Sequence, residues 1–222
     1  MASLLFSAAA KMLLGLFLMF APLFGCAGTL RYPNAWLMLA ILLIPMAAMG
    51  IVLAAKAPKL LEKRINMREK ERSQMWVVAL SGILILLMFA FAGLDFRFGW
   101  SQLPKPYILI AAALFLLGYA LYAEVLRENT WLSRTVEIQQ GQKLVDTGLY
   151  AVVRHPMYAA VVLIFLSMPL VLGSLPAFVI MLPYPILLAM RIREEEKMLT
   201  RGLQGYAEYR QRVRWRMIPF IW

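Results

Sequence analysis

Residues 154–158 read Arg154-His155-Pro156-Met157-Tyr158 and lead into the almost wholly apolar run 159–171. Proline fixes its own φ and disfavours the helical conformation for the residue before it, so we expect a helix to begin at Pro156 with His155 just outside. Residues 146–150, Asp-Thr-Gly-Leu-Tyr, favour a turn before the motif. Free N–H groups at the start of this helix would suit a polar or anionic ligand group beside His155, the only histidine in the chain.

The composition predicts an integral membrane protein. Hydrophobic residues make up 62% of the 222 positions, charged residues only 16%, and the mean hydropathy is +0.71. The formal net charge is +11, but the basic residues cluster between apolar spans and do not alternate with stacking aromatics, so we expect an anionic lipid surface and no nucleic acid as partner. With one cysteine, Cys26, and one histidine, neither a disulfide framework nor a Cys/His metal site is expected.

The apolar runs predict an all-α, polytopic transmembrane bundle with about six membrane segments. A helix of about 20 apolar residues crosses a bilayer, and four runs of this length occupy residues 4–27, 35–55, 74–94 and 107–126. Two shorter arms, 158–172 and 177–190, are joined by Gly173-Ser174-Leu175-Pro176 and predict a tight helical hairpin bent by its prolines. The first run ends in Leu23-Phe24-Gly25-Cys26, which is similar to a lipoprotein cleavage site, but bulky Phe24 favours an uncleaved helix.

Charge predicts the orientation of these segments. The chain is basic or polar at residues 56–72 and 124–150, and eight lysines and arginines follow residue 190. Because cytoplasmic loops carry the excess of Lys and Arg, we expect both termini in the cytoplasm. The membrane would be the inner membrane in a bacterium or the endoplasmic reticulum in a eukaryote.

The hairpin should return its second arm to the neighbourhood of His155. That arm leads into Arg191 and the acidic triplet Glu194-Glu195-Glu196. The triplet could be neutralised by nearby cations in a purely structural role, but its return to the histidine favours a ligand site. Beyond it, the helical spacing of residues 199, 203, 206 and 213 predicts an amphipathic C-terminal helix on the membrane face.

An ordered set of motifs in the second half of the chain resembles the C-terminal catalytic region of the isoprenylcysteine carboxyl methyltransferase family. In chain order these are Gly148-Leu149-Tyr150, the 154–158 motif, the hairpin, Arg191, Glu195-Glu196 and the tail residues Leu199, Tyr206, Tyr209, Val213 and Pro219. That family is related to the phospholipid N-methyltransferases. The resemblance covers roughly residues 119–221. It departs at Gly202-Leu203-Gln204-Gly205, where the family has Phe-Gly, and at Arg214-Trp215, where it often has proline.

The resemblance implies S-adenosyl-L-methionine as cofactor and a lipidic or prenylated substrate that enters from the bilayer. The apolar runs predict N-terminal transmembrane helices over residues 1–106, and the resemblance implies a methyltransferase-like region over 107–222. The cofactor-binding residues it implies are Tyr150, His155, Pro156, Tyr158, Glu195 and Glu196. The residues it implies for catalysis are Arg154, Arg191 and Glu195, with an arginine holding an anionic group of cofactor or substrate.

The methyl acceptor stays open at this point. Transfer to a carboxylate cancels opposite charges in a cavity of low polarity, whereas an amine must arrive neutral and give its proton to a group such as Glu195. A phospholipid N-methyltransferase is therefore one alternative. A second is an NADPH-dependent reductase, because membrane sterol reductases are similar here; their tyrosine is commonly followed by Gly-Glu, whereas Tyr158 precedes Ala159-Ala160. A third is a non-catalytic scaffold in which the charges only anchor the tail.

Overall fold

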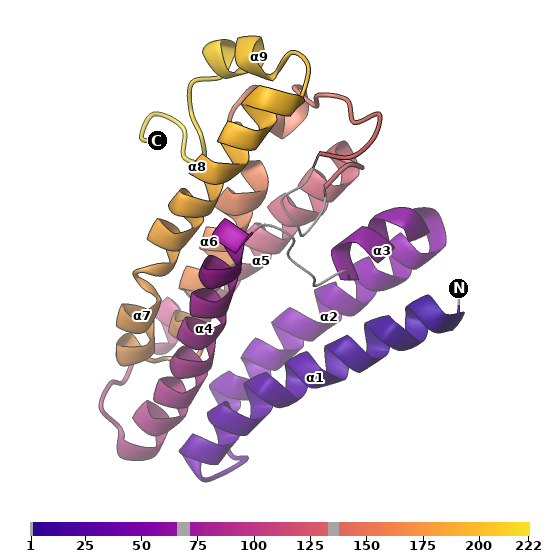
Figure 1. Ribbon diagram of the computed structural model, residues 1–222. Coiled ribbons are helices and arrows are strands. Elements are labelled where there is room, and N and C mark those ends of the chain that lie inside the picture. The colour runs from indigo at the N-terminus through magenta and orange to yellow at the C-terminus, as the bar shows by residue number, and fades with distance from the viewer. Residues whose placement is uncertain (1, 66–71, 133–137) are drawn as a thin grey trace.

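The computed structural model describes residues 2–65, 72–132 and 138–222, which form helices, turns and irregular segments without a β-strand. The helices are α1 (Ala2–Ala27), α2 (Pro33–Lys56), α3 (Pro58–Ile65), α4 (Arg72–Phe98), α5 (Lys105–Glu128), the 3-10 helix η1 (Gly148–Ala151), α6 (Pro156–Val171), α7 (Leu175–Met181), α8 (Tyr184–Gly202) and α9 (Tyr206–Arg212) (Figure 1). The predicted all-α fold is confirmed. The charged segments predicted at 56–72 and 124–150 lie partly outside the described residues.

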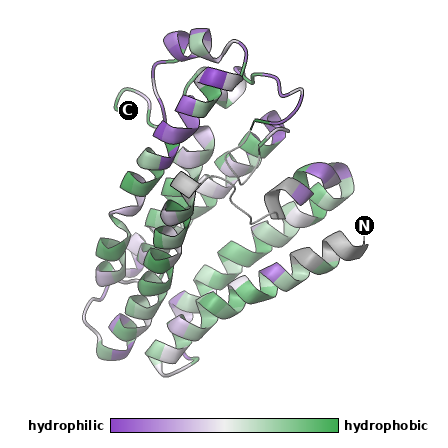
Figure 2. Cartoon of the chain, in the orientation of Figure 1, coloured by the Kyte–Doolittle hydropathy of each residue, from purple (hydrophilic) through white to green (hydrophobic). Residues whose placement is uncertain are grey.

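The long helices carry the apolar surface that a bilayer requires. Five stretches are long and apolar enough to cross: Ala9–Ala27, Pro33–Lys56, Met75–Phe98, Lys105–Glu128 and Leu175–Gly202; the shorter apolar helix is α6. Large side chains such as Phe6 and Ile51 are 76% and 70% exposed, which an aqueous surface would disfavour. Figure 2 shows hydrophobic residues along the helices and hydrophilic residues gathered at one end, on α3, the end of α8 and α9. The described chain is therefore a bundle of about six membrane segments, as predicted.

Small residues let the helices approach closely. A Cβ added to Gly118 of α5 would lie 2.7 Å from the Ile164 side chain of α6. Around this contact, Phe115, Met168 and Met181 are at most 3% exposed and belong to one core that joins the α1–α2 pair to α4–α8. The core is continuous, so α6 and α8 are held in a fixed relation to each other.

Gly93 gives a first testable prediction. A Cβ at this position of α4 would overlap the Leu23 carbonyl oxygen of α1 and lie 2.9 Å from the Ala27 nitrogen. Because backbone cannot yield as a side chain can, Gly93→Ala is expected to cost about 1–3 kcal/mol by overpacking and to lower the unfolding temperature in detergent. Gly82→Ala, on the same helix with no neighbouring atom within 4 Å, is the matched control. Equal melting of the two variants would contradict the close packing of α1 on α4.

Three turns are tied together at one end of the bundle, which we call the closed end (residues 28–32, 99–104 and 172–174). The Tyr32 hydroxyl donates to the Leu172 carbonyl oxygen at 2.6 Å. The buried Asp95 carboxylate accepts from the Ser101 nitrogen at 2.7 Å and from its hydroxyl at 2.5 Å. The Leu175 nitrogen donates to that same Ser101 hydroxyl oxygen at 3.1 Å. These bonds satisfy the polar groups of the turns, as burial requires.

The predicted hairpin is confirmed, with one difference in its second arm. Helix α6 and helix α7 are joined through residues 172–174, and the Ser174 hydroxyl caps α7 by accepting from the Ala177 nitrogen at 3.2 Å. The second arm is two helices, because α7 ends at Met181 and α8 begins at Tyr184 after Pro183. Pro183 and Pro185 lack the N–H groups that a continuous helix would need there.

The predicted C-terminal helix is present but divided. Helix α8 ends at Gly202, and Gly205, with a φ of 81°, turns the chain before α9 begins. This left-handed conformation suits glycine, and it ends the helical path so that α9 leaves in a different direction from α8. Leu203, Tyr206, Tyr209 and Val213 still gather into one apolar cluster, but they do so across a turn.

Candidate functional site

The hairpin brings the middle of α8 against the start of α6, at the end of the bundle opposite the closed end. The Tyr158 hydroxyl donates to Glu195 Oε2 at 2.6 Å, and Arg191 Nε donates to the Tyr158 oxygen at 3.1 Å. Tyr158 and Arg191 are 5% and 8% exposed. These two hydrogen bonds connect Arg191, Tyr158 and Glu195 and fix all three side chains. The sequence correctly predicted that these groups meet.

The motif residues adopt the local structure that Pro156 dictates. His155 lies outside the helix with φ −129° and ψ 60°, and Pro156 is the first residue of α6. The Arg154 and His155 nitrogens donate to the Trp215 and Arg216 carbonyl oxygens, at 3.0 and 2.7 Å. The C-terminal tail is therefore hydrogen-bonded along the backbone of the motif.

A buried ionic network lies behind this backbone and centres on Glu196, which is 3% exposed. Arg154 Nε donates to its Oε1 at 2.6 Å and Arg216 Nε to its Oε2 at 2.8 Å. His155 Nε2 lies 3.4 Å from Oε1, close enough for an ionic interaction but without a hydrogen bond. The second guanidinium nitrogen of Arg154 is also committed, since it donates to the carbonyl oxygens of Val213 and Arg214. The network joins α8, the motif and the tail.

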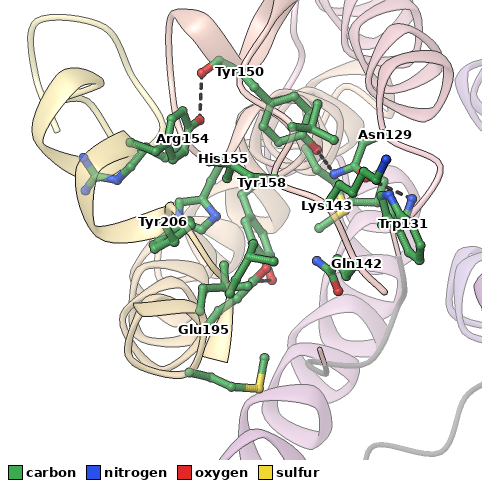
Figure 3. A pocket seen from close by; sticks show the side chains of 18 of the residues that line it. Asn129, Trp131, Gln142, Lys143, Tyr150, Arg154, His155, Tyr158, Glu195 and Tyr206 are labelled. Atoms are coloured by element: carbon green, nitrogen blue, oxygen red, sulfur yellow. Dashed lines mark hydrogen bonds between the residues drawn. The ribbon is translucent and has the colours of Figure 1, made fainter. Parts of the chain in front are cut away.

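A cavity opens between the start of α6, α8, α9 and residues 129–132 and 138–150, which we call the covering segment. Figure 3 shows Arg154, His155 and Tyr206 on one side and Asn129, Trp131, Gln142 and Lys143 on the other, with Tyr158 and Glu195 between them. Two hydrogen bonds hold the end of this covering segment that leads into the motif. Leu149 N donates to the Glu128 carboxylate at 3.0 Å, and the Tyr209 hydroxyl donates to the Tyr150 carbonyl oxygen at 2.7 Å.

Two buried polar atoms in the residues lining this cavity have no hydrogen-bond partner within the described ranges. They are His155 Nε2 and the Tyr206 hydroxyl. Burial raises the pKa of the Tyr206 phenol above its ordinary value, so the hydroxyl keeps its proton. Nearly all buried polar groups are paired, and His155 Nε2 at least lies 3.4 Å from the Glu196 carboxylate, so the Tyr206 hydroxyl is the more unusual of the two.

The residues selected from the sequence divide between the cavity and its support. Those lining the cavity are Tyr150, Arg154, His155, Tyr158, Arg191 and Glu195. Glu196 is held in the ionic network, and Pro156 starts α6; neither is among the lining residues. Glu194 points elsewhere again, since it pairs with Lys197 at 2.6 Å on the exposed face of α8.

Sequence reasoning missed the far wall of the cavity. Asn129, Trp131, Gln142 and Lys143 belong to a segment interpreted only as a polar cytoplasmic loop. Trp131 was the available signal, because a tryptophan in a polar stretch beside a membrane span needs an apolar surface to cover. Tyr206 was noted in the apolar spacing of the tail and among the residues that carry the resemblance, and neither observation indicates where its hydroxyl lies.

Comparison with known proteins gives two findings. Residues 106–205 match the family model of phospholipid methyltransferases. Over 136 residues the chain is 25% identical to the Delta(14)-sterol reductase TM7SF2 of Mus musculus and 28% identical to the Delta(14)-sterol reductase of Methylotuvimicrobium alcaliphilum. These matches cover 55% and 54% of this chain, which spans only about a third (32%) of the length of each relative. The matched region contains the motif, the hairpin and the acidic triplet, so this part of the chain is similar to the phospholipid methyltransferases.

Proposed function

We propose that the protein is an integral membrane methyltransferase that uses S-adenosyl-L-methionine and acts on a lipidic or amphiphilic substrate, most like isoprenylcysteine carboxyl O-methylation. The observation that carries the proposal is the cavity in which the motif of α6 and Glu195 of α8 face each other, inside the region that matches the family. The substrate class rests on the membrane setting. The surrounding helices expose apolar side chains to the bilayer, from which an amphiphile can enter.

The residues of the cavity fit the proposed cofactor. The Tyr206 hydroxyl offers an unpaired polar atom, Glu195 offers a carboxylate to an amino or ribose group, and Tyr150 and Trp131 offer aromatic surface. His155 lines the same cavity, with its Nε2 3.4 Å from Glu196. The bound cofactor would supply a methyl group activated by its positively charged sulfur. The protein's contribution is then to position the reactants and to exclude water.

The roles of Arg191 and Glu195 depend on whether the methyl acceptor is a carboxylate or an amine. Arg191 donates to the Tyr158 hydroxyl, which in turn donates to Glu195, so this carboxylate is oriented before any ligand binds. For a carboxylate acceptor, Arg191 is the arginine that would hold the anionic group, because Arg154 is committed to Glu196 and two carbonyl oxygens. For an amine acceptor, as in phospholipid N-methylation, Glu195 would receive the proton.

The proposed orientation puts this cavity on the cytoplasmic side. The basic end of α8 and the tail lie at the same end of the bundle as α3 (Figure 1), and excess positive charge favours the cytoplasm. Both termini are then cytoplasmic. The division of the chain into residues 1–106 and 107–222, with the reaction assigned to the second part, belongs to the same proposal.

Ligand-dependent melting gives the first test of this function. A ligand that binds the folded state at a hundredfold excess over its Kd stabilises that state by about 2.7 kcal/mol. We therefore expect S-adenosylhomocysteine to raise the unfolding temperature of the detergent-purified protein by several degrees, and NADPH to leave it unchanged. Incubation with a lipid extract and cofactor bearing a deuterated methyl group, followed by mass spectrometry, would then identify the acceptor. Failure of S-adenosylhomocysteine to bind in lipid would contradict the proposal.

A second candidate function is an NADPH-dependent reductase of the sterol type. It is favoured by both sterol reductases that match the chain. The same melting experiment separates the two, since stabilisation by NADPH without stabilisation by S-adenosylhomocysteine would reverse their order. The family match and the Ala159-Ala160 that follows Tyr158 support the methyltransferase.

A further inference from the structure

Helix α9 presents two buried tyrosines to the site, and only one of them has its hydroxyl satisfied by the described chain. Tyr206 and Tyr209 are each 3% exposed, and their ring centroids lie 5.7 Å apart. The Tyr209 hydroxyl donates to the Tyr150 carbonyl oxygen at 2.7 Å. The Tyr206 hydroxyl has no partner in the described ranges. The two tyrosines lie on one short helix but differ in whether the hydroxyl is free to bind a ligand.

The Tyr206 ring is held where it is by packing. It belongs to the cluster of Leu203, Tyr209 and Val213, against which Ile138 and Leu144 of the covering segment pack. The turn at Gly205, with its positive φ, sets the direction in which α9 leaves α8. The hydroxyl therefore cannot reach solvent by a simple change of rotamer without breaking the cluster.

The surroundings of the hydroxyl indicate what it can bind. Tyr206 lines the same cavity as His155 and Glu195, and Figure 3 shows it beside the motif residues. The charged groups that act on the phenol are Glu196, Glu195 and Arg154. Arg154 and Glu196 are paired with each other at 2.6 Å, and Glu195 accepts from Tyr158. A neutral phenol in this place has a proton to donate and no acceptor among the described residues, an arrangement that is costly unless a ligand provides one.

We infer that the Tyr206 hydroxyl is a ligand-binding group that donates a hydrogen bond to an oxygen or nitrogen acceptor of the nucleoside cofactor. The inference rests on the proposed function for the identity of the cofactor and adds to it a contact from α9. It also gives the tail a defined role. The tail closes one side of the cavity and supplies part of its polar lining.

Two matched variants test the inference, Tyr206→Phe and Tyr209→Phe. Each removes one hydroxyl and keeps the ring, so packing is preserved. In titration calorimetry with S-adenosylhomocysteine, Tyr206→Phe should bind about tenfold more weakly, the loss expected for one hydrogen bond. Without ligand it should melt at the temperature of the unmodified protein or above, because no protein hydrogen bond is lost. Tyr209→Phe should melt lower without ligand and lose less affinity.

The outcomes separate this inference from the proposed function. If the unmodified protein binds S-adenosylhomocysteine and Tyr206→Phe binds it equally well, the inference is overturned and the methyltransferase proposal stands. If the unmodified protein binds only NADPH, and Tyr206→Phe binds NADPH about tenfold more weakly, the hydroxyl is a ligand contact although the proposed cofactor is wrong. Binding of neither molecule overturns both. A lowered melting temperature of ligand-free Tyr206→Phe would mean a structural partner and would also count against the inference.

Discussion

Glu196→Ala is expected to lower the free energy of unfolding by about 3–5 kcal/mol, the largest loss of stability among the acidic residues of α8. Glu196 is 3% exposed and receives hydrogen bonds from Arg154 and Arg216. Its removal would leave the Arg154 guanidinium, itself 6% exposed, as a buried positive charge without a counter-ion. It would also free the tail at the point where Arg216 holds it to α8.

Thermal and denaturant unfolding in detergent would measure this loss. Glu194→Ala is the control, because Glu194 pairs with Lys197 on an exposed face, where such a pair contributes about 0–1 kcal/mol. Adding Arg154→Ala to Glu196→Ala should recover much of the lost free energy of unfolding, because the double variant leaves neither charge without the other. A double-mutant cycle measures this recovery. If Glu196→Ala and Glu194→Ala melt alike, the ionic network does not hold the tail.

Glu195→Gln is expected to lower methyl transfer at least 100-fold while the unfolding temperature changes little. Glu195 lines the cavity and accepts from the Tyr158 hydroxyl at 2.6 Å. Glutamine keeps the size of the side chain and one acceptor oxygen, so packing and the tyrosine contact survive. The negative charge is lost, and a hydrogen bond to a charged group is worth about 1.5–3 kcal/mol, or roughly 10- to 150-fold in binding, before any effect on the reaction itself.

The measurement is the initial rate of transfer of a deuterated methyl group to lipid, together with titration of S-adenosylhomocysteine. Glu194→Gln, one position away on the exposed face, should keep both values. Unchanged transfer by Glu195→Gln would remove this residue from the site. A scaffold role for the acidic residues predicts instead that Glu195→Asp with Glu196→Asp keeps the function, whereas the methyltransferase proposal predicts loss of transfer in a folded protein.

Much of the fold could be predicted because its signals are local. Runs of about 20 apolar residues predicted the long helices to within a few residues, since a bilayer imposes that length wherever the chain crosses. Pro156 predicted the start of α6 and the position of His155 outside it, because proline acts on its nearest neighbours. The prediction that the hairpin returns α8 to the histidine followed from the length of its two arms.

The order of the three glutamates in the sequence could not predict which one faces the cavity and which ones face solvent or the core. Successive residues of a helix point about 100° apart, so Glu194, Glu195 and Glu196 face solvent, cavity and core. Which one faces the cavity depends on how α8 is rotated against α6. That rotation is set by packing between segments distant in the chain, as is the pairing of the tail with Arg154 and His155. The break at Gly205 was hidden for a similar reason, because the apolar spacing continues across it.

The closed end of the bundle determines where the protein can move. Tyr32, Asp95 and Ser101 link three turns through hydrogen bonds. At the opposite end, the covering segment is held where Leu149 meets Glu128 and Tyr150 meets Tyr209. The linked turns therefore restrain the closed end, and we expect any movement that admits a ligand to occur on the side of the cavity. Under the proposed function, we expect an amphiphilic substrate to enter and leave on that side, while the linked turns hold the other ends of the helices together.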